Sequence, residues 1–244
     1  MFSRHKKPPT IFHITHQKAG SQWILFAFKT LIPDRFVEPK ANHEQFFKTP
    51  IVEGGFYPTI YLPRKSFESV PIPENHKKFV VIRDLRDTLV SFYFSMKYSH
   101  ALLAESIREM RDTLNRLPID DGLIFLMKRF EGHHAVIQDS WFDSGELILK
   151  YEDLITDETP RLLELFDFCE IRASKKQRLE AIAKSSFKSR SSGRLLGEEN
   201  PKHHLRKGTP GDWKNHFSQP VKQAFKEKFG PLLIKTGYET NLDW

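Results

Sequence analysis

The feature that most constrains the fold is a repeated order of short apolar segment, turn and amphipathic helix. Residues 11–15 are apolar and β-prone, and Ile24, Phe28 and Leu31 then recur at helical spacing until Pro33. Residues 79–82 form a second strongly β-prone run. Strand and helix therefore alternate, which favours an α/β fold with a central parallel β-sheet flanked by helices.

The rest of the chain continues this order less regularly. After the second run, Leu85, Leu89, Phe92 and Met96 keep the 4-3-4 spacing of one helix face. We expect a third strand at 147–149 and a short one at 59–62, within an otherwise irregular stretch over 33–76. Further expectations are helices over 103–142, 161–168 and 219–235, and a long loop over 188–207. No repeat or low-complexity linker is present, so residues 1–244 are predicted to form one domain.

Composition limits the possible cellular compartment and the type of ligand. The single cysteine, Cys169, excludes an internal disulfide and fits a reducing, cytoplasmic setting. Arg4, Lys6 and Lys7 precede an apolar run over 11–14 that is too short for a signal peptide, and no apolar run approaches the roughly 18 residues of a membrane span. The net charge of +7 indicates an anionic ligand or partner, without separating a nucleotide from nucleic acid, membrane or acidic glycan.

A candidate anion site lies between the first strand and its helix, at Lys18–Trp23. Gly20 allows the backbone to approach a ligand closely, and we expect Ser21 to cap the helix. The helix amino end offers free N–H groups, and Lys18 adds a full charge. A plain turn with a surface lysine is the alternative. The segment is not a Walker A loop, because its lysine precedes the glycine.

Arg83 ends the second strand, at the same sheet edge as Lys18, and Ser91 follows on the next helix. A guanidinium and a hydroxyl there are suited to a second phosphate. The alternative is an exposed Arg/Asp cluster over 83–87 that pairs with itself. The late segment 206–213 has two cations followed by two glycines and could close over a phosphate, or be a basic surface turn.

Together with Tyr151-Glu152-Asp153 after the third strand, these segments resemble the sulfotransferases that use 3′-phosphoadenosine-5′-phosphosulfate (PAPS). The family loop P-K-S-G-T-T-W appears here as Gln17–Trp23. Its strand-end arginine, with a serine eight residues later, matches Arg83 and Ser91. Its late R-K-G-x-x-G-D-W-K motif is intact from Arg206 to Lys214. The motifs occur in family order over residues 11–217.

The resemblance implies a P-loop-NTPase-like sulfotransferase fold. It also implies in-line transfer of a sulfuryl group from PAPS to a hydroxyl or amine, releasing 3′-phosphoadenosine-5′-phosphate (PAP), with no metal. Lys18 would be catalytic and would stabilise the leaving phosphate. The implied nucleotide contacts fall into three groups: Lys18, Ala19, Gly20, Ser21 and Gln22 for the 5′-phosphosulfate; Trp23, Tyr151, Ser185 and Phe187 for adenine; Arg83, Ser91, Arg206, Lys207 and Gly208 for the 3′-phosphate.

The sequence departs from the family at the general base. Tyr61 stands where a histidine is usual, and a tyrosine with pKa near 10 is a poor base at pH 7. His43, Glu53 and His100 are the nearby alternatives, and each could equally be a structural residue. The family's dimer motif is altered over 214–223, so the oligomeric state is left open.

The acceptor pocket should come from 33–76 and 97–145, and the acceptor could be a small molecule, a lipid or a glycan. The aromatic residues of the first stretch could line an apolar cleft or belong to the core: Phe46, Phe47, Phe56, Tyr57 and Tyr61.

Three other functions compete with the sulfotransferase. They are a P-loop kinase or NTPase, a non-catalytic nucleotide-binding protein, and a nucleic-acid or heparin-like binding module. The last rests on charge alone, and we expect no nucleic-acid partner. A metal site at His133-His134 or His203-His204 is not expected, because adjacent residues point in different directions.

Overall fold

The computed structural model describes residues 7–244, so Arg4 and Lys6 lie outside the described residues. Its centre is a four-stranded parallel sheet in the order β2-β1-β3-β4. The strands are β1 (Thr10–Thr15), β2 (Phe56–Ile60), β3 (His76–Ile82) and β4 (Leu147–Lys150). Every residue of β1 is buried, as expected for a central strand with both faces covered. The predicted parallel α/β architecture is confirmed.

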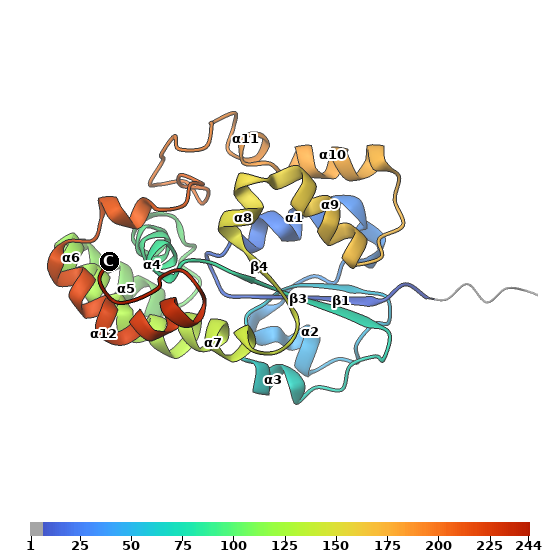
Figure 1. Cartoon of the computed structure of the whole chain (residues 1–244), viewed down its shortest axis with the longest axis horizontal. Coiled ribbons are helices and arrows are strands. Elements are labelled where there is room, and N and C mark those ends of the chain that lie inside the picture. Colours follow the sequence, from blue (N-terminus) through green and yellow to red (C-terminus); the bar gives the residue numbers. More distant parts are fainter. Residues whose placement is uncertain (1–6) are drawn as a thin grey trace, which may run out of the picture.

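Helices cover both faces of the sheet (Figure 1). Because side chains alternate along a strand, Phe79 and Val81 of β3 enter one core, while Val80 and Ile82 enter the other. The first core is closed by α1 (Ser21–Leu31), α8 (Tyr151–Thr156), α9 (Glu158–Phe168) and α10 (Lys175–Ser185). The second is closed by α2 (Glu44–Phe47), α3 (Arg64–Glu68) and α7 (Val136–Phe142).

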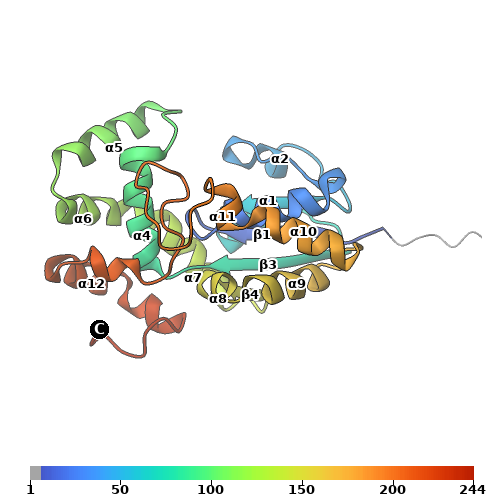
Figure 2. The same cartoon turned by 90° about the horizontal axis from the view of Figure 1, so that it is seen from above.

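A third group of helices lies beyond the carboxyl ends of the strands, on the left of Figures 1 and 2. It has its own core, which contains Leu85, Leu89, Phe92 and Met96, so the predicted helix face is confirmed. Its elements are α4 (Leu85–Phe94), π-helix η3 (Ser95–Ser99), α5 (Glu105–Arg116), α6 (Ile119–Phe130), π-helix η4 (Glu131–Ala135) and α12 (Gln219–Lys235). No helix among residues 7–244 has both the length and the apolar composition needed to cross a membrane.

The remaining elements are short. They are η1 (Pro33–Arg35), η2 (Ala41–His43), α11 (Phe187–Arg190) and η5 (Asp212–Asn215), and most of 191–211 is a loop, as predicted. The expected strand at 59–62 is displaced to Phe56–Ile60. Pro58 is tolerated there because β2 is an edge strand. Thr59, at φ 52°, falls in the register shift between β1 and β2, and the pairing resumes at Ile60, where β2 ends.

Candidate active site

Each of the four parallel strands ends in a segment that reaches one cavity of about 760 Å³. The residues concerned are Lys18 after β1, Tyr61 after β2, Arg83 after β3 and Tyr151 at the start of α8, directly after β4. Parallel sheets bind ligands at this edge. All of the predicted nucleotide contacts line this cavity except Ala19, which is fully buried behind it.

The turn between β1 and α1 has two residues in the left-handed region, Lys18 at φ 70° and Gly20 at φ 80°. A Cβ on Gly20 would stand 2.7 Å from Cδ2 of Tyr151, so glycine is required for packing as well as for conformation. The prediction that Ser21 caps this helix is wrong. Gly20 holds the cap position, Ser21 begins the helix, and its Oγ lies 2.9 Å from Oη of Tyr61. Within residues 7–244, no group accepts from the backbone N–H of Ser21 or Gln22, which leaves these donors for a ligand.

The Lys18 ammonium group has no hydrogen-bond or ion-pair partner in the described part of the chain. Burial, together with the positive charges of Arg83 and Arg206, lowers the pKa of Lys18 to about 8. A lysine held among other cations is unfavourable for the empty protein, and an anion in the cavity relieves that repulsion.

Arg83 faces the cavity from the end of β3. Its Nη1 donates to the Lys18 carbonyl at 2.9 Å, and its guanidinium lies 4.5 Å from the centre of the Tyr151 ring. Its buried Nε has no hydrogen-bond partner among residues 7–244. The neighbouring Arg/Asp cluster over 83–87 is buried, not exposed. Arg86 pairs with Asp84 at 2.7 Å, which leaves the Arg83 guanidinium directed to the cavity.

The late loop, residues 206–213, is held by two carboxylates that do not line the cavity. Asp87 of α4 accepts from the backbone N–H of Gly211 at 2.6 Å and of Trp213 at 2.8 Å. Asp212 pairs with Arg206 and with Lys207, each at 2.5 Å. These contacts place both cations at the cavity wall.

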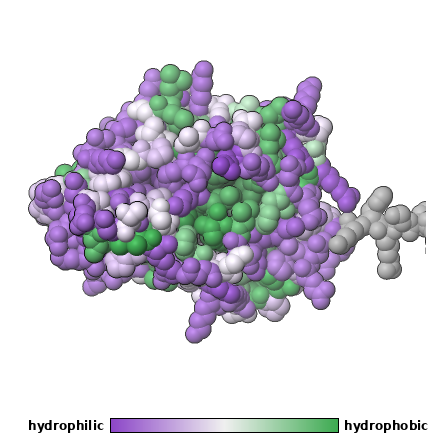
Figure 3. Space-filling model, viewed as in Figure 1, coloured by the Kyte–Doolittle hydropathy of each residue, from purple (hydrophilic) through white to green (hydrophobic). Residues whose placement is uncertain are grey.

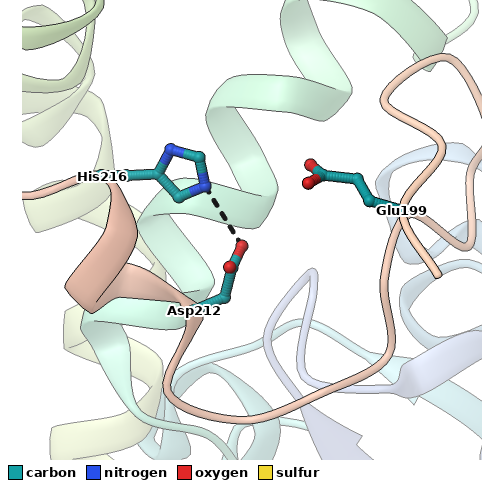
Figure 4. A group of neighbouring side chains, drawn as sticks. All are labelled: Glu199, Asp212 and His216. Atoms are coloured by element: carbon teal, nitrogen blue, oxygen red, sulfur yellow. Dashed lines mark hydrogen bonds and ion pairs between the residues drawn. The ribbon is translucent and has the colours of Figure 1, made fainter. Parts of the chain in front are cut away.

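Glu199 and His216 lie close to the loop residue Asp212 (Figure 4), with the potential ligand atoms of all three within 4.8 Å of one another. Burial favours protonation of Asp212, but hydrogen bonds from His216, Lys207, Asn215 and Arg206 outweigh it and hold the pKa of Asp212 well below its usual range. Glu199 also pairs with Arg206, at 2.5 Å. The carboxylates therefore act as counter-charges to the late-loop cations.

An aromatic recess adjoins the β1–α1 turn. Trp23 and Tyr151 meet edge to face at 6.2 Å, and Tyr151 Oη donates to the Gly208 carbonyl at 3.2 Å. Gly208 lies so close to Phe187 that an added Cβ would stand 2.8 Å from its ring. Ser185 closes this wall and donates its own hydroxyl to Ile182. The four predicted adenine contacts thus border one space.

The three candidates for the general base differ in their position relative to the cavity. His100 lines the cavity, whereas His43 and Glu53 do not. His43 Nε2 accepts from the backbone N–H of Tyr61 at 2.9 Å, and exposed Glu53 pairs with Lys7 at 2.8 Å. Tyr61 lines the cavity, but burial raises its pKa further, which makes it a weaker base at pH 7.

Of the two stretches expected to form the acceptor pocket, residues 97–145 line the cavity and residues 33–76 mostly do not. That the acceptor binds there stays a prediction. Of residues 33–76 only Tyr61 reaches the cavity; Phe46, Phe56 and Tyr57 are core, and Phe47 is half-exposed elsewhere. Residues 97–145 supply a whole wall. Several cavity residues were missed because no local sequence signal distinguishes them: Gln17, Lys128, Arg129, His133, His134, Arg190 and His204. Arg190 also donates to the Gln22 carbonyl at 2.9 Å, which ties α11 to the β1–α1 turn.

The family model of the sulfotransferase domain matches residues 8–237. The chain belongs to the sulfotransferase domain family. It is 24% identical to Sulfotransferase 2A6 of Mus musculus over 93% of this chain and 85% of that one. It is 25% identical to the 3-alpha-hydroxysteroid sulfotransferase of Cavia porcellus, over 94% of this chain and 84% of that one.

Solved structures agree with this membership at the level of the fold. Mouse sulfotransferase SULT7A1, complexed with PAP, superimposes with a TM-score of 0.63 at 17% identity, covering 92% of this chain and 84% of that one. Retinol dehydratase, in a complex with retinol and PAP, gives a TM-score of 0.56 at 17% identity, covering 93% and 82%. The expected sulfotransferase fold is thereby confirmed.

Proposed function

We propose that this sulfotransferase moves a sulfuryl group from PAPS to a hydroxyl or amine acceptor and releases PAP. The observation that carries the proposal is the convergence of Lys18, Arg83, Lys207 and the amino end of α1 on one cavity. Family membership supports it, as does the presence of PAP in both solved relatives.

The residues present fit such a nucleotide. The buried Nε atoms of Arg83 and Arg206 have no hydrogen-bond partner in the described chain, and such donors are costly unless a ligand accepts from them. With Ser91 and Lys207, they form a second position that can bind an anion, in addition to the one at Lys18 and the free N–H groups of α1. Two anion-binding positions beside an aromatic recess match a nucleotide with phosphates at both the 5′ and the 3′ carbon.

PAPS supplies a sulfur that the acceptor atom attacks while the bond from sulfur to the bridging 5′-phosphate oxygen breaks and PAP leaves. Lys18, which has no ion-pair partner among residues 7–244, would stabilise the charge that develops on that oxygen. Because it interacts more strongly with that charge than with the ground state, it lowers the barrier.

His100 is the base that we assign to the acceptor proton. It is the one of the three sequence candidates that reaches the cavity. Burial, and then the charges of Lys18, Arg111 and Arg129, lower its pKa, so the imidazole is neutral at pH 7 and can accept a proton.

The experiment that tests the function is calorimetry with PAP and AMP, followed by mass spectrometry of acceptors incubated with PAPS. AMP lacks the 3′-phosphate, so it should lose roughly 1.5–3 kcal/mol for each charge-assisted contact that is missing. Equal affinity for the two nucleotides would contradict the proposal. Tight PAP binding without transfer to any acceptor would favour the non-catalytic alternative instead.

A further inference from the structure

The cavity continues past Lys18 into a part walled by α4, η3, α5, α6 and η4, and its charge there is one-sided. No aspartate or glutamate of residues 7–244 lines any part of the cavity. At the nucleotide end, Asp212 and Glu199 balance the late-loop cations from behind. At the far end, the exposed cations Lys128 and Arg129 have no acidic ion-pair partner among the described residues, and the adjacent Glu131 pairs with Lys228.

These two cations do not serve a helix end. Lys128 and Arg129 occupy the last turn of α6, where cations often stabilise exposed carbonyls. Here α6 runs directly into η4 and α7, and Glu131 and Val136 at the junctions keep helical backbone angles. The carbonyls therefore remain within a continuous helix, and capping does not explain the charges.

Lys18 and Arg129 act on the same histidines. After burial, the charges that lower the pKa of His100 include both Lys18 and Arg129, and the same holds for His134. Lys18, Arg129 and both histidines line the same cavity, and the lowered pKa of each histidine leaves its imidazole neutral at pH 7.

The wall between these charges is apolar with two unsatisfied polar side chains. Phe92, Met96 and Met110 line it. Ser95 Oγ and both ring nitrogens of His134 are buried without a hydrogen-bond partner in the described part of the chain, and both side chains line the cavity. An unpaired buried polar group is unfavourable, and a hydroxylated ligand that hydrogen-bonds to it would offset that cost. Ser95 and His134 also lie on the two π-helices, a form of helix that is frequent at functional sites.

We propose that the acceptor of the sulfuryl group is a small amphipathic hydroxy acid whose anionic group is bound by Lys128 and Arg129. Its apolar body lies against Phe92 and Met96, and a hydroxyl reaches the space between Lys18 and His100. This inference rests on the proposed function. In the transfer, the acceptor oxygen bonds to sulfur, the S–O bond to the 5′-phosphate breaks, and the hydroxyl proton passes to His100.

A different role for the same cations is electrostatic attraction of the nucleotide. The two roles differ in what Lys128 and Arg129 change. If they bind the acceptor, their removal weakens the acidic acceptor and leaves PAP affinity as it was. If they attract the nucleotide, PAP affinity falls and acceptor preference stays.

The experiment measures dissociation constants by calorimetry, with and without saturating PAP, for two matched pairs. One pair is 4-hydroxyphenylacetate and 4-hydroxyphenylacetamide; the other is 4-hydroxycyclohexanecarboxylate and its amide. The test protein is the double variant Lys128→Gln, Arg129→Gln. The control is Lys175→Gln, Arg116→Gln, which removes the same charge from exposed positions outside the cavity.

We expect the wild-type protein and the control to bind each acid roughly tenfold to a hundredfold more tightly than its amide. The test variant should lose that preference while keeping its PAP affinity, and added salt should weaken the acids alone. Equal affinity for acid and amide in both pairs would overturn the inference. So would a loss of PAP affinity with the acid preference retained. Failure of PAP to bind at all would instead count against the proposed function, since acid selectivity is also read in the nucleotide-free protein.

Discussion

At the scale of single residues, the unpaired ammonium of Lys18 should make activity depend on pH. With a pKa of about 8, Lys18 is charged below that pH and loses its charge above it. We therefore expect kcat/KM for PAPS to fall through pH 8 and upward, towards a tenfold loss per pH unit. The decline in kcat should begin at a higher pH, because a bound phosphate favours the charged form of Lys18.

Lys18→Arg is the informative variant for this decline, because arginine stays charged throughout the range. It should abolish the decline near pH 8 even if its activity is lower overall. Lys18→Ala should lose about 10²–10³-fold in kcat while remaining folded. A wild-type profile that stays flat from pH 7 to 9.5, in protein shown to be folded by circular dichroism, would remove Lys18 from the rate-determining charge stabilisation.

His100 carries a second prediction at this scale. His100→Gln should lower kcat by about 10²–10⁴-fold with an aliphatic alcohol, which needs a base, and by much less with an acidic phenol. Glu53→Gln is the matched control, because that carboxylate pairs with Lys7 away from the cavity. Full activity of His100→Gln with the alcohol would show that the proton leaves by another route.

At the scale of elements, the late loop depends on one arginine. Arg194 donates to the carbonyls of Ser191, Glu198, Leu205 and Arg206, at 2.5–3.3 Å. A lysine has a single ammonium and cannot reproduce this set of fixed donors. We expect Arg194→Lys to weaken PAP binding by about tenfold, the equivalent of about one lost contact.

The affinity for AMP distinguishes this positioning role from a general loss of stability. AMP has no 3′-phosphate to meet Arg206 and Lys207, so its affinity should change little in Arg194→Lys. Arg172→Lys, at an exposed position without a described partner, controls for the substitution itself. Parallel losses for PAP and AMP would mean that Arg194 supports the whole fold and not the late loop.

The elements also show how far sequence reasoning reaches. Strands β1, β3 and β4 were predicted because their apolar runs are continuous, and their ends located Lys18, Arg83 and Tyr151 correctly. β2 was misplaced because its Pro58 argues against a strand, and only its edge position makes that residue acceptable. Arg129 and His134 were not recognised as cavity residues, because their place depends on how α6 and η4 pack across the sheet edge.

At the scale of the whole molecule, hydrophilic and apolar residues are mixed on the face shown in Figure 3, and apolar residues gather near its centre. Beneath the surface, polar contacts join the sheet layers to the helical layer beyond them. Glu152 of α8 accepts from the backbone N–H of Asp84 and from Tyr238 Oη, each at 2.9 Å. Arg86 pairs with Glu239 at 2.5 Å and stacks 4.4 Å from the Trp244 ring. The strand-end turn of β3 thus contacts the last residues of the chain.

That the chain is one domain stays a prediction, and these contacts make it testable. The cavity is lined by Trp23 from one core and by Phe92 from another, so a nucleotide bound there should stabilise both together. We expect one calorimetric unfolding transition. PAP at a hundred times its dissociation constant should add about 2.7 kcal/mol, which raises Tm by about 5–10 °C for a chain of this size. The whole transition should move. If instead PAP shifts one transition and leaves a second in place, the helical layer beyond the sheet unfolds independently, and the cavity joins two domains.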